Sequence, residues 1–198
     1  MNNFDYHIPT DVYFGKGQIN KLGQRMSSIA KKVLLVYGGG SIKKIGLYDQ
    51  IMEQLKQAGI TVFELAGVEP NPRIQTVKKG VAVCKQEGIE GVLAVGGGST
   101  IDCAKVVSAG ACYDGDAWDL VLDNNKIKKV LPIAAVLTLA ATGSEMDGFA
   151  VISDMYCGSR INKACIFNSR SAVHIQRFQI SNCRWIFRYH EPYFRKLF

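Results

Sequence analysis

Short apolar runs alternate with amphipathic segments along most of this 198-residue chain, and this alternation restricts the fold more than any other feature. The runs have the length and β-branched composition of buried strands, and they cover residues 33–37, 60–65, 91–95 and 131–138. Helix-like segments lie between them, at residues 46–58, at residues 74–87 and in a third stretch that ends at Val107. Strands that alternate with helices are joined by right-handed crossovers and form a parallel sheet. The sequence therefore predicts a doubly wound α/β domain, with residues 1–30 supplying an extra edge hairpin.

Two of the expected strands end in Gly-Gly-Gly-Ser, at residues 38–41 and 96–99. Ligands of doubly wound sheets lie beyond the carboxyl ends of the strands. Bare glycine backbone lets a phosphate reach the amide groups there, and the helix that follows directs its positive end at the anion. Ser99 or Thr100 is placed to cap that helix. A plain glycine-rich turn is the alternative, and neither turn matches the usual Rossmann or P-loop spacing.

The residues after the first glycine turn bear on which dinucleotide would bind. Tyr37 and the glycines are followed by Lys43 and Lys44, with no acid after that strand. NAD sites usually place an acid on the ribose hydroxyl, whereas a backbone nest beside cations suits a 2′-phosphate. The pattern favours NADP over NAD, with plain surface charges as the alternative for the two lysines.

Several longer segments together resemble the iron-containing alcohol dehydrogenases, in their butanol dehydrogenase branch. The segments follow one another in order from residue 1 to about residue 155; they are FGKG (14–17), YGGGSIKK (37–44), VEPNPR (68–73), VGGGSTIDCAK (95–105), LPIAAVLTLAATGSEM (131–146) and AVISD (150–154). The resemblance implies hydride transfer between NADP, or NAD, and a small alcohol or aldehyde.

The same resemblance implies roles for particular residues. The pyrophosphate of the cofactor would be held by Gly97, Gly98, Ser99 and Asp102. The adenosine end would lie against Gly38, Gly39, Gly40 and Ser41. Further contacts to the nucleotide are implied for Asn71, Thr138 and Thr142.

Members of that family are longer and hold a divalent metal, iron or zinc, in a second, helical domain. One Asp and three His bind it, and the metal polarises the alcohol oxygen. The first Asp and His lie four residues apart on a helix, which places both on one face. His174 and His190 are preceded at that distance by Arg170 and Ile186. We therefore expect no metal on this chain, and the sequence identifies no catalytic residue.

The composition changes near residue 155. Residues 1–155 contain 16 Lys or Arg and 16 Asp or Glu, whereas residues 156–198 contain eight basic residues and one acid. Such a break predicts a boundary between a dinucleotide-binding domain, 1–155, and a poorly packed basic tail, 156–198. A reading-frame slip is one hypothesis for the tail, because codons for residues 183–198 exist that yield DIMSHTFE, similar to the family's first metal-ligand segment, when read one base on. The gene sequence tests it.

These observations lead to a main reading and to alternatives. In the main interpretation, the chain belongs to a family of NAD(P)-dependent alcohol dehydrogenases but is truncated and inactive. The alternatives are a non-catalytic nucleotide-binding fragment, an enzyme similar to glycerol dehydrogenase or dehydroquinate synthase, and a basic-tail nucleic-acid binder, the last of which we do not expect. Six cysteines without a C-x-x-C pair fit free thiols. No secretory signal and no bilayer-length apolar run are present, so the expected location is cytosolic, and a homodimer is compatible with the sequence.

Overall fold

A six-stranded parallel sheet forms the centre of the computed structural model, which describes residues 10–154 and the backbone of residues 161–166 and 176–179. Its strand order is β1-β8-β5-β4-β2-β3. The strands are β1 (Val12–Phe14), β2 (Lys32–Tyr37), β3 (Thr61–Leu65), β4 (Gly91–Gly96), β5 (Ile133–Leu137) and β8 (Gln176–Gln179). A separate antiparallel pair consists of β6 (Phe149–Asp154) and β7 (Ile161–Ile166).

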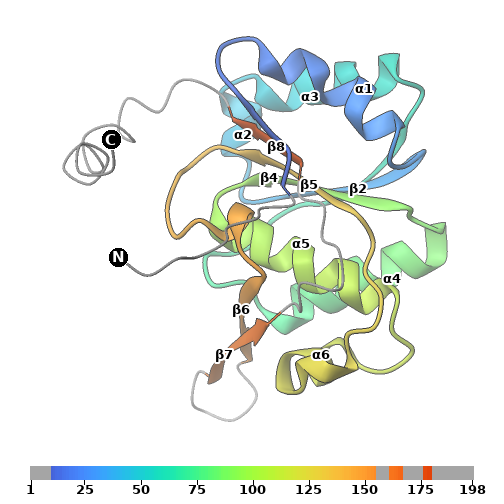
Figure 1. Ribbon diagram of the computed structural model, residues 1–198, viewed down its shortest axis with the longest axis vertical. Helices are drawn as coiled ribbons and strands as arrows, with labels where there is room; N and C mark the ends of the chain where they lie inside the picture. Colours follow the sequence, from blue (N-terminus) through green and yellow to red (C-terminus); the bar gives the residue numbers. More distant parts are fainter. Residues whose placement is uncertain (1–9, 155–160, 167–175, 180–198) are drawn as a thin grey trace, which may run out of the picture.

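Helices cover both faces of the sheet, as Figure 1 shows. The α-helices are α1 (Leu22–Ser27), α2 (Ser41–Lys44), α3 (Leu47–Gln57), α4 (Ile74–Glu87), α5 (Gly98–Ala111) and α6 (Ala117–Leu122). Short 3₁₀ turns are η1 (Gln18–Lys21), η2 (Asn124–Lys126) and η3 (Ser144–Met146). Helices α1 and α3 pack on one face, and α4, α5 and α6 pack on the other.

The side-chain pattern of β2 explains why the sheet needs two helical layers. Val33 and Leu35 join the core cluster under α1 and α3, whereas Leu34 and Val36 join the cluster under α4 and α5. All four side chains are fully buried. Successive side chains of a strand point to opposite faces, so a continuous apolar run requires cover on both sides.

The direction of winding reverses between β2 and β4. From β2 the chain passes through α3 to β3 at one edge, and then α4 carries it back past β2 to β4. The two connecting helices lie on opposite faces of the sheet. Such a reversal opens a crevice at the carboxyl ends of the two strands, which is where doubly wound proteins bind ligands. Both glycine turns follow these two strands.

Most of the predicted elements are confirmed. The strands and helices lie where the sequence placed them, although α5 continues to Ala111, beyond the predicted end at Val107. The edge hairpin predicted within residues 1–30 is wrong for the described residues, because β1 pairs in parallel with β8 and residues 18–27 form η1 and α1. Strands β7 and β8 lie beyond residue 155, the predicted domain boundary. This boundary stays a prediction.

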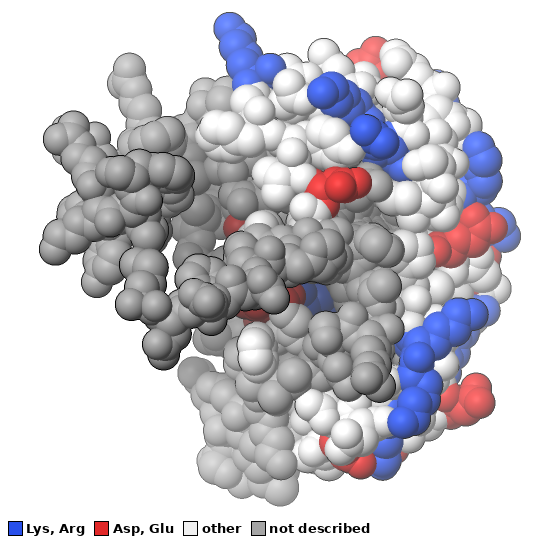
Figure 2. All heavy atoms as spheres, viewed as in Figure 1, with Lys and Arg blue, Asp and Glu red and all other residues white. Residues whose placement is uncertain are grey.

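Charged side chains are interspersed over the face of the molecule in Figure 2, with basic and acidic groups alternating across its described part. This agrees with the balanced charge of residues 1–155. Within the described residues, none of the helices combines the length and the apolar composition needed to cross a bilayer.

Candidate functional site

The turn between β4 and α5 presents the first amide groups of a long helix. Gly97 is the N-cap residue, and its carbonyl accepts the N–H groups of Thr100 and Ile101 at 3.1 and 3.2 Å. The N–H groups at the start of a helix have no partner within the helix, and the helix dipole adds positive potential there. The turn is therefore built to receive an anionic group such as a phosphate. The N-cap is not Ser99 or Thr100, as the sequence had suggested, and no side chain caps this helix.

The three glycines of this turn serve different purposes. A Cβ on Gly96 would lie 2.4 Å from Oγ1 of the buried Thr100, so packing alone excludes any other residue there. A Cβ on Gly97 or Gly98 would meet nothing closer than 3.6 Å and 3.5 Å respectively. The bare backbone at these two positions is not required by packing and leaves the helix start open.

The loop after β3 closes over both turns. Asn71 adopts a left-handed backbone (φ 55°), and its N–H donates to the Ser99 hydroxyl at 3.4 Å. The N–H groups of Gly67 and Val68 donate to the carbonyls of Gly38 and Tyr37, at 3.2 and 3.1 Å. This loop thus joins the two predicted turns to Asn71, a contact that no spacing rule in the sequence could foresee.

The segment after β5 forms the opposite wall of the crevice. The Thr138 N–H donates to the Gly96 carbonyl at 3.0 Å, which continues the β4–β5 pairing into the turn. The nearest atom to a Cβ on Gly98 would be Oγ1 of Thr142. All the residues that the resemblance assigned to the nucleotide therefore lie near the carboxyl ends of the parallel strands. Their contact with a nucleotide stays a prediction.

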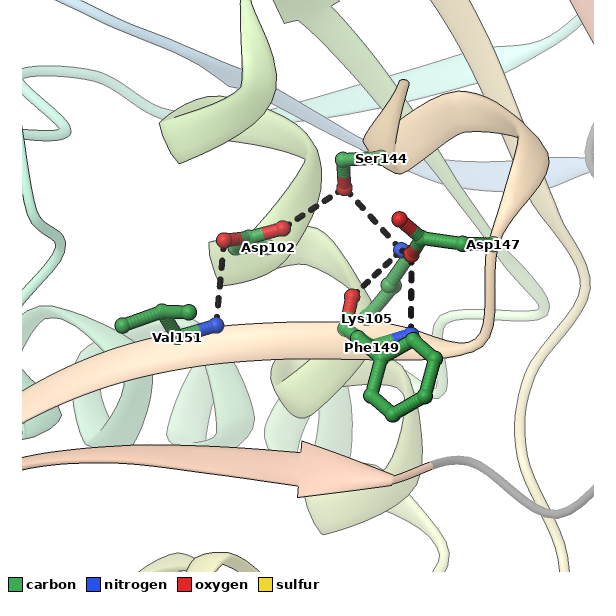
Figure 3. Close-up of polar contacts among 6 residues, drawn as sticks. All are labelled: Asp102, Lys105, Ser144, Asp147, Phe149 and Val151. Atoms are coloured by element: carbon green, nitrogen blue, oxygen red, sulfur yellow. Dashed lines mark hydrogen bonds and ion pairs between the residues drawn. The ribbon is translucent and has the colours of Figure 1, made fainter. Parts of the chain in front are cut away.

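A buried polar network fixes this wall to α5 (Figure 3). The Lys105 side chain is fully buried, and its Nζ donates to Ser144 Oγ, Asp147 Oδ1 and the Phe149 carbonyl at 3.0, 3.0 and 2.6 Å. Three acceptors match the three N–H bonds of an ammonium group. The Ser144 hydroxyl in turn donates to Asp102 Oδ1 at 2.6 Å, and the Val151 N–H donates to Asp102 Oδ2 at 3.0 Å.

The hydrogen bonds of this network give Asp102 a structural role. Both of its carboxylate oxygens accept bonds from the wall segment, so in this arrangement Asp102 holds the wall in place. Burial raises the pKa of Asp102, although the two bonds that it accepts oppose the shift. Burial lowers the pKa of Lys105, and the carboxylate of Asp147 opposes that shift. The sequence motif contained both residues, but it did not show that they bind residues 144–151.

A second polar cluster lies beside the first glycine turn, and sequence reasoning missed its acid. Glu64 of β3 accepts the hydroxyls of Tyr37 and Tyr48, each at 2.6 Å. The Lys43 ammonium lies over the rings of these two tyrosines, 5.3 and 4.5 Å from their centroids. Strand β2, which leads into this turn, carries no acid of its own, but its neighbour β3 supplies one. The single acid within the otherwise uncharged run of β3 was the available signal.

The described residues contain no group of three or more His, Cys, Asp or Glu side chains that could hold a metal ion. All three histidines of the sequence, at positions 7, 174 and 190, lie outside the described residues. The segment of the frame-slip hypothesis, 183–198, lies outside them as well, as do Arg170 and Ile186. The structure therefore supplies no donor set from which a metal-dependent step could be derived.

A doubly wound sheet with an open helix start at its switch point defines the nucleotide-binding class of α/β domains. The family described as iron-containing alcohol dehydrogenase matches residues 9–170, and the chain belongs to this family. The family match reaches beyond residue 155, where the resemblance was expected to end.

Comparisons with individual proteins agree with this assignment. The chain is 59% identical over 155 residues to NADH-dependent butanol dehydrogenase B of Clostridium acetobutylicum, which covers 78% of this chain and 40% of that protein. It is 43% identical over 163 residues to an NADPH-dependent aldehyde reductase of Escherichia coli, covering 81% and 41%. The crystal structure of NADH-dependent butanol dehydrogenase A from Thermotoga maritima superposes with a TM-score of 0.82 at 45% identity, covering 91% and 44%. The chain thus spans about 40% of the length of the curated relatives it matches.

Proposed function

We propose that this chain binds a nicotinamide dinucleotide in the crevice between the ends of β2 and β4. The observation that carries the proposal is the open start of α5, where Gly97 and Gly98 are bare although packing does not require it. The pyrophosphate would rest on the first amides of α5, and the adenosine would extend towards residues 38–41. The wall that Lys105 and Asp102 hold would close the other side.

We propose further that the protein acts in NAD(P)-dependent oxidation of small alcohols or reduction of aldehydes. This rests on the family and on relatives named as butanol dehydrogenases and an aldehyde reductase. The described residues would contribute the binding and orientation of the cofactor. The family's metal would polarise the substrate oxygen, and the described residues contain no group of three or more His, Cys, Asp or Glu side chains that could hold it. Cytosolic location and a homodimer remain predictions.

The proposed binding of the dinucleotide can be tested by adding one methyl group at Gly98. Gly98→Ala places a Cβ no closer than 3.5 Å to any neighbour, so the variant should fold normally. The methyl would occupy the phosphate approach, and the affinity for NADH should fall at least tenfold, about 1.4 kcal/mol. Isothermal titration calorimetry of the wild type and the variant with NADH and NADPH measures this.

The matched control is Gly39→Ala in the first turn, where a Cβ would meet nothing within 4 Å. Its effect should be smaller, because residue 39 precedes only a single helical turn and not the start of a long helix. Wild-type protein that binds neither dinucleotide would exclude the proposal, as would a Gly98→Ala variant with unchanged affinity.

A further inference from the structure

A cluster of four side chains lies beside the crevice, on the side where β3 pairs with β2. Its members are Glu64, Lys43, Tyr37 and Tyr48. Tyr37 is the last residue of β2 and is directly followed by the first glycine turn. Glu64 is next to last in β3, the outer neighbour of β2. Lys43 belongs to α2, which begins at the end of that turn. The four side chains therefore form a cluster beside the turn against which a nucleoside bound across the switch point would rest.

The cluster holds two opposite charges together. Burial favours the neutral acid, but the hydroxyls of Tyr37 and Tyr48 stabilise the carboxylate, and the pKa of Glu64 is lowered. The bond to Glu64 raises the pKa of Tyr48 to about 12, so both tyrosines remain donors. Lys43 faces the same two rings and its pKa is raised, chiefly by Tyr37. At neutral pH the cluster therefore has one negative and one positive charge.

We propose that Glu64 sets the dinucleotide specificity of this site, by compensating Lys43 so that NADH is favoured over NADPH. The inference rests on the proposed function. A 2′-phosphate brings close to two negative charges at neutral pH and gains from an uncompensated ammonium group. With Glu64 beside Lys43, that gain is offset by repulsion from the carboxylate. The lysines had pointed to NADP because the acid from the next strand was not visible in the local sequence.

Two substitutions of opposite sign test the proposal. Glu64→Gln keeps the size of the side chain and one of its two acceptor oxygens but removes its charge. The ratio of Kd for NADPH to Kd for NADH should fall about fivefold, as for one charge at a partly solvated distance. Lys43→Met leaves the carboxylate uncompensated, and the same ratio should rise by a similar factor. Calorimetric titration of each variant with both dinucleotides gives the ratio.

The control is Lys56→Met, which removes an exposed lysine from the last turn of α3, at the end of the helix that leads into the start of β3 and away from the glycine turns. It should leave the ratio within twofold of the wild type. If Glu64→Gln unfolds, the two exposed lysine variants still provide the comparison. Binding of both dinucleotides with a ratio that neither Glu64→Gln nor Lys43→Met changes would overturn this inference alone. Absence of any binding to the wild type would overturn the proposed function as well.

Discussion

At the scale of single residues, Lys105 is the side chain whose position most needs an explanation. Burying an ammonium group costs several kcal/mol unless it is paired and hydrogen-bonded. Lys105 meets both conditions, since its three donors have three acceptors and one of these is the Asp147 carboxylate. The acceptors all lie in residues 144–149, which contain only a short 3₁₀ turn and the start of β6. The buried ammonium group of Lys105 therefore holds this segment on α5 through polar bonds.

The first prediction of stability follows from this burial. Lys105→Met keeps the length of the side chain but removes the ammonium group from Asp147 and the Phe149 carbonyl, and only the Phe149 N–H still donates to Asp147 Oδ1. The free energy of unfolding should fall by about 3 kcal/mol, the lower end for breaking a buried pair, because the Asp147 side chain is 36% exposed. Urea denaturation followed by circular dichroism measures it.

Lys78→Met is the matched control, because it removes an ion pair to Asp116 of 2.6 Å whose side chains are 47% and 48% exposed. Exposed pairs contribute little, so this variant should lose less than about 1 kcal/mol. Equal losses in the two lysine variants would contradict the role given to Lys105.

Residue-scale expectations from the sequence succeeded where the chemistry is local in the chain. The turn at residues 96–99 precedes its own helix, so the presence of a helix start there could be inferred from the local sequence, although its N-cap residue is Gly97 and not Ser99 or Thr100. The roles of Glu64 and Asp102 could not, because their partners lie 16 to 49 residues away in the sequence. The separate roles of Gly96 and Gly98 depend on the side chains beside them, Thr100 at Gly96 and Thr142 at Gly98, whose positions no sequence pattern reports.

At the scale of elements, close contacts between helices rely on two glycines of different kinds. A Cβ on Gly23 of α1 would lie 2.4 Å from the backbone carbonyl oxygen of Gln54 in α3. A Cβ on Gly80 of α4 would lie 2.8 Å from methyl groups of Leu65 and Val107. Backbone atoms move only with their whole helix, whereas methyl groups shift by rotation about side-chain bonds.

The two alanine substitutions should therefore differ in cost. Overpacking typically costs 1–3 kcal/mol, and replacing a helical glycine returns about 1 kcal/mol. Gly23→Ala should lose about 2 kcal/mol of unfolding free energy, and Gly80→Ala less than about 1 kcal/mol. Urea midpoints of both variants measure the difference, and a larger loss for Gly80→Ala would show that the α1–α3 contact is less rigid than described.

Elements were predictable where an apolar period continues for several residues. Leu47, Ile51 and Leu55 lie four apart and are all buried in α3, as the sequence indicated. Strand β1 has only three residues, two of them with exposed side chains, and pairs with a strand from beyond residue 170. Its partner could not be foreseen, because hairpin rules consider only neighbours in the sequence.

At the scale of the whole molecule, the two core clusters share one sheet. Strands β2, β4 and β5 each place side chains in both clusters, so neither helical layer can separate without exposing the centre of the sheet. Cys84 of α4 and Cys103 of α5 belong to the same cluster and are 3% and 0% exposed, whereas Cys112 is partly exposed. Burial raises the pKa of Cys84 and of Cys103 to about 12.

These thiols report on the coupling between binding and global unfolding. In iodoacetamide at pH 8, Cys112 should be the first of these three cysteines to be alkylated, since the thiolate is the reactive form and the two buried thiols become accessible only when the domain opens. Peptide mapping by mass spectrometry follows each site separately.

NADH at about 100 times its Kd should slow the labelling of Cys84 and Cys103 about 100-fold, because a ligand of the folded state lowers the unfolded population by that factor. Cys112 should keep its rate, and at the same NADH concentration the protection in Gly98→Ala, which binds at least tenfold more weakly, should be about tenfold or less. Labelling of Cys103 as fast as that of Cys112 would mean that α5 opens alone, and the helix start could then not act as a rigid cofactor support.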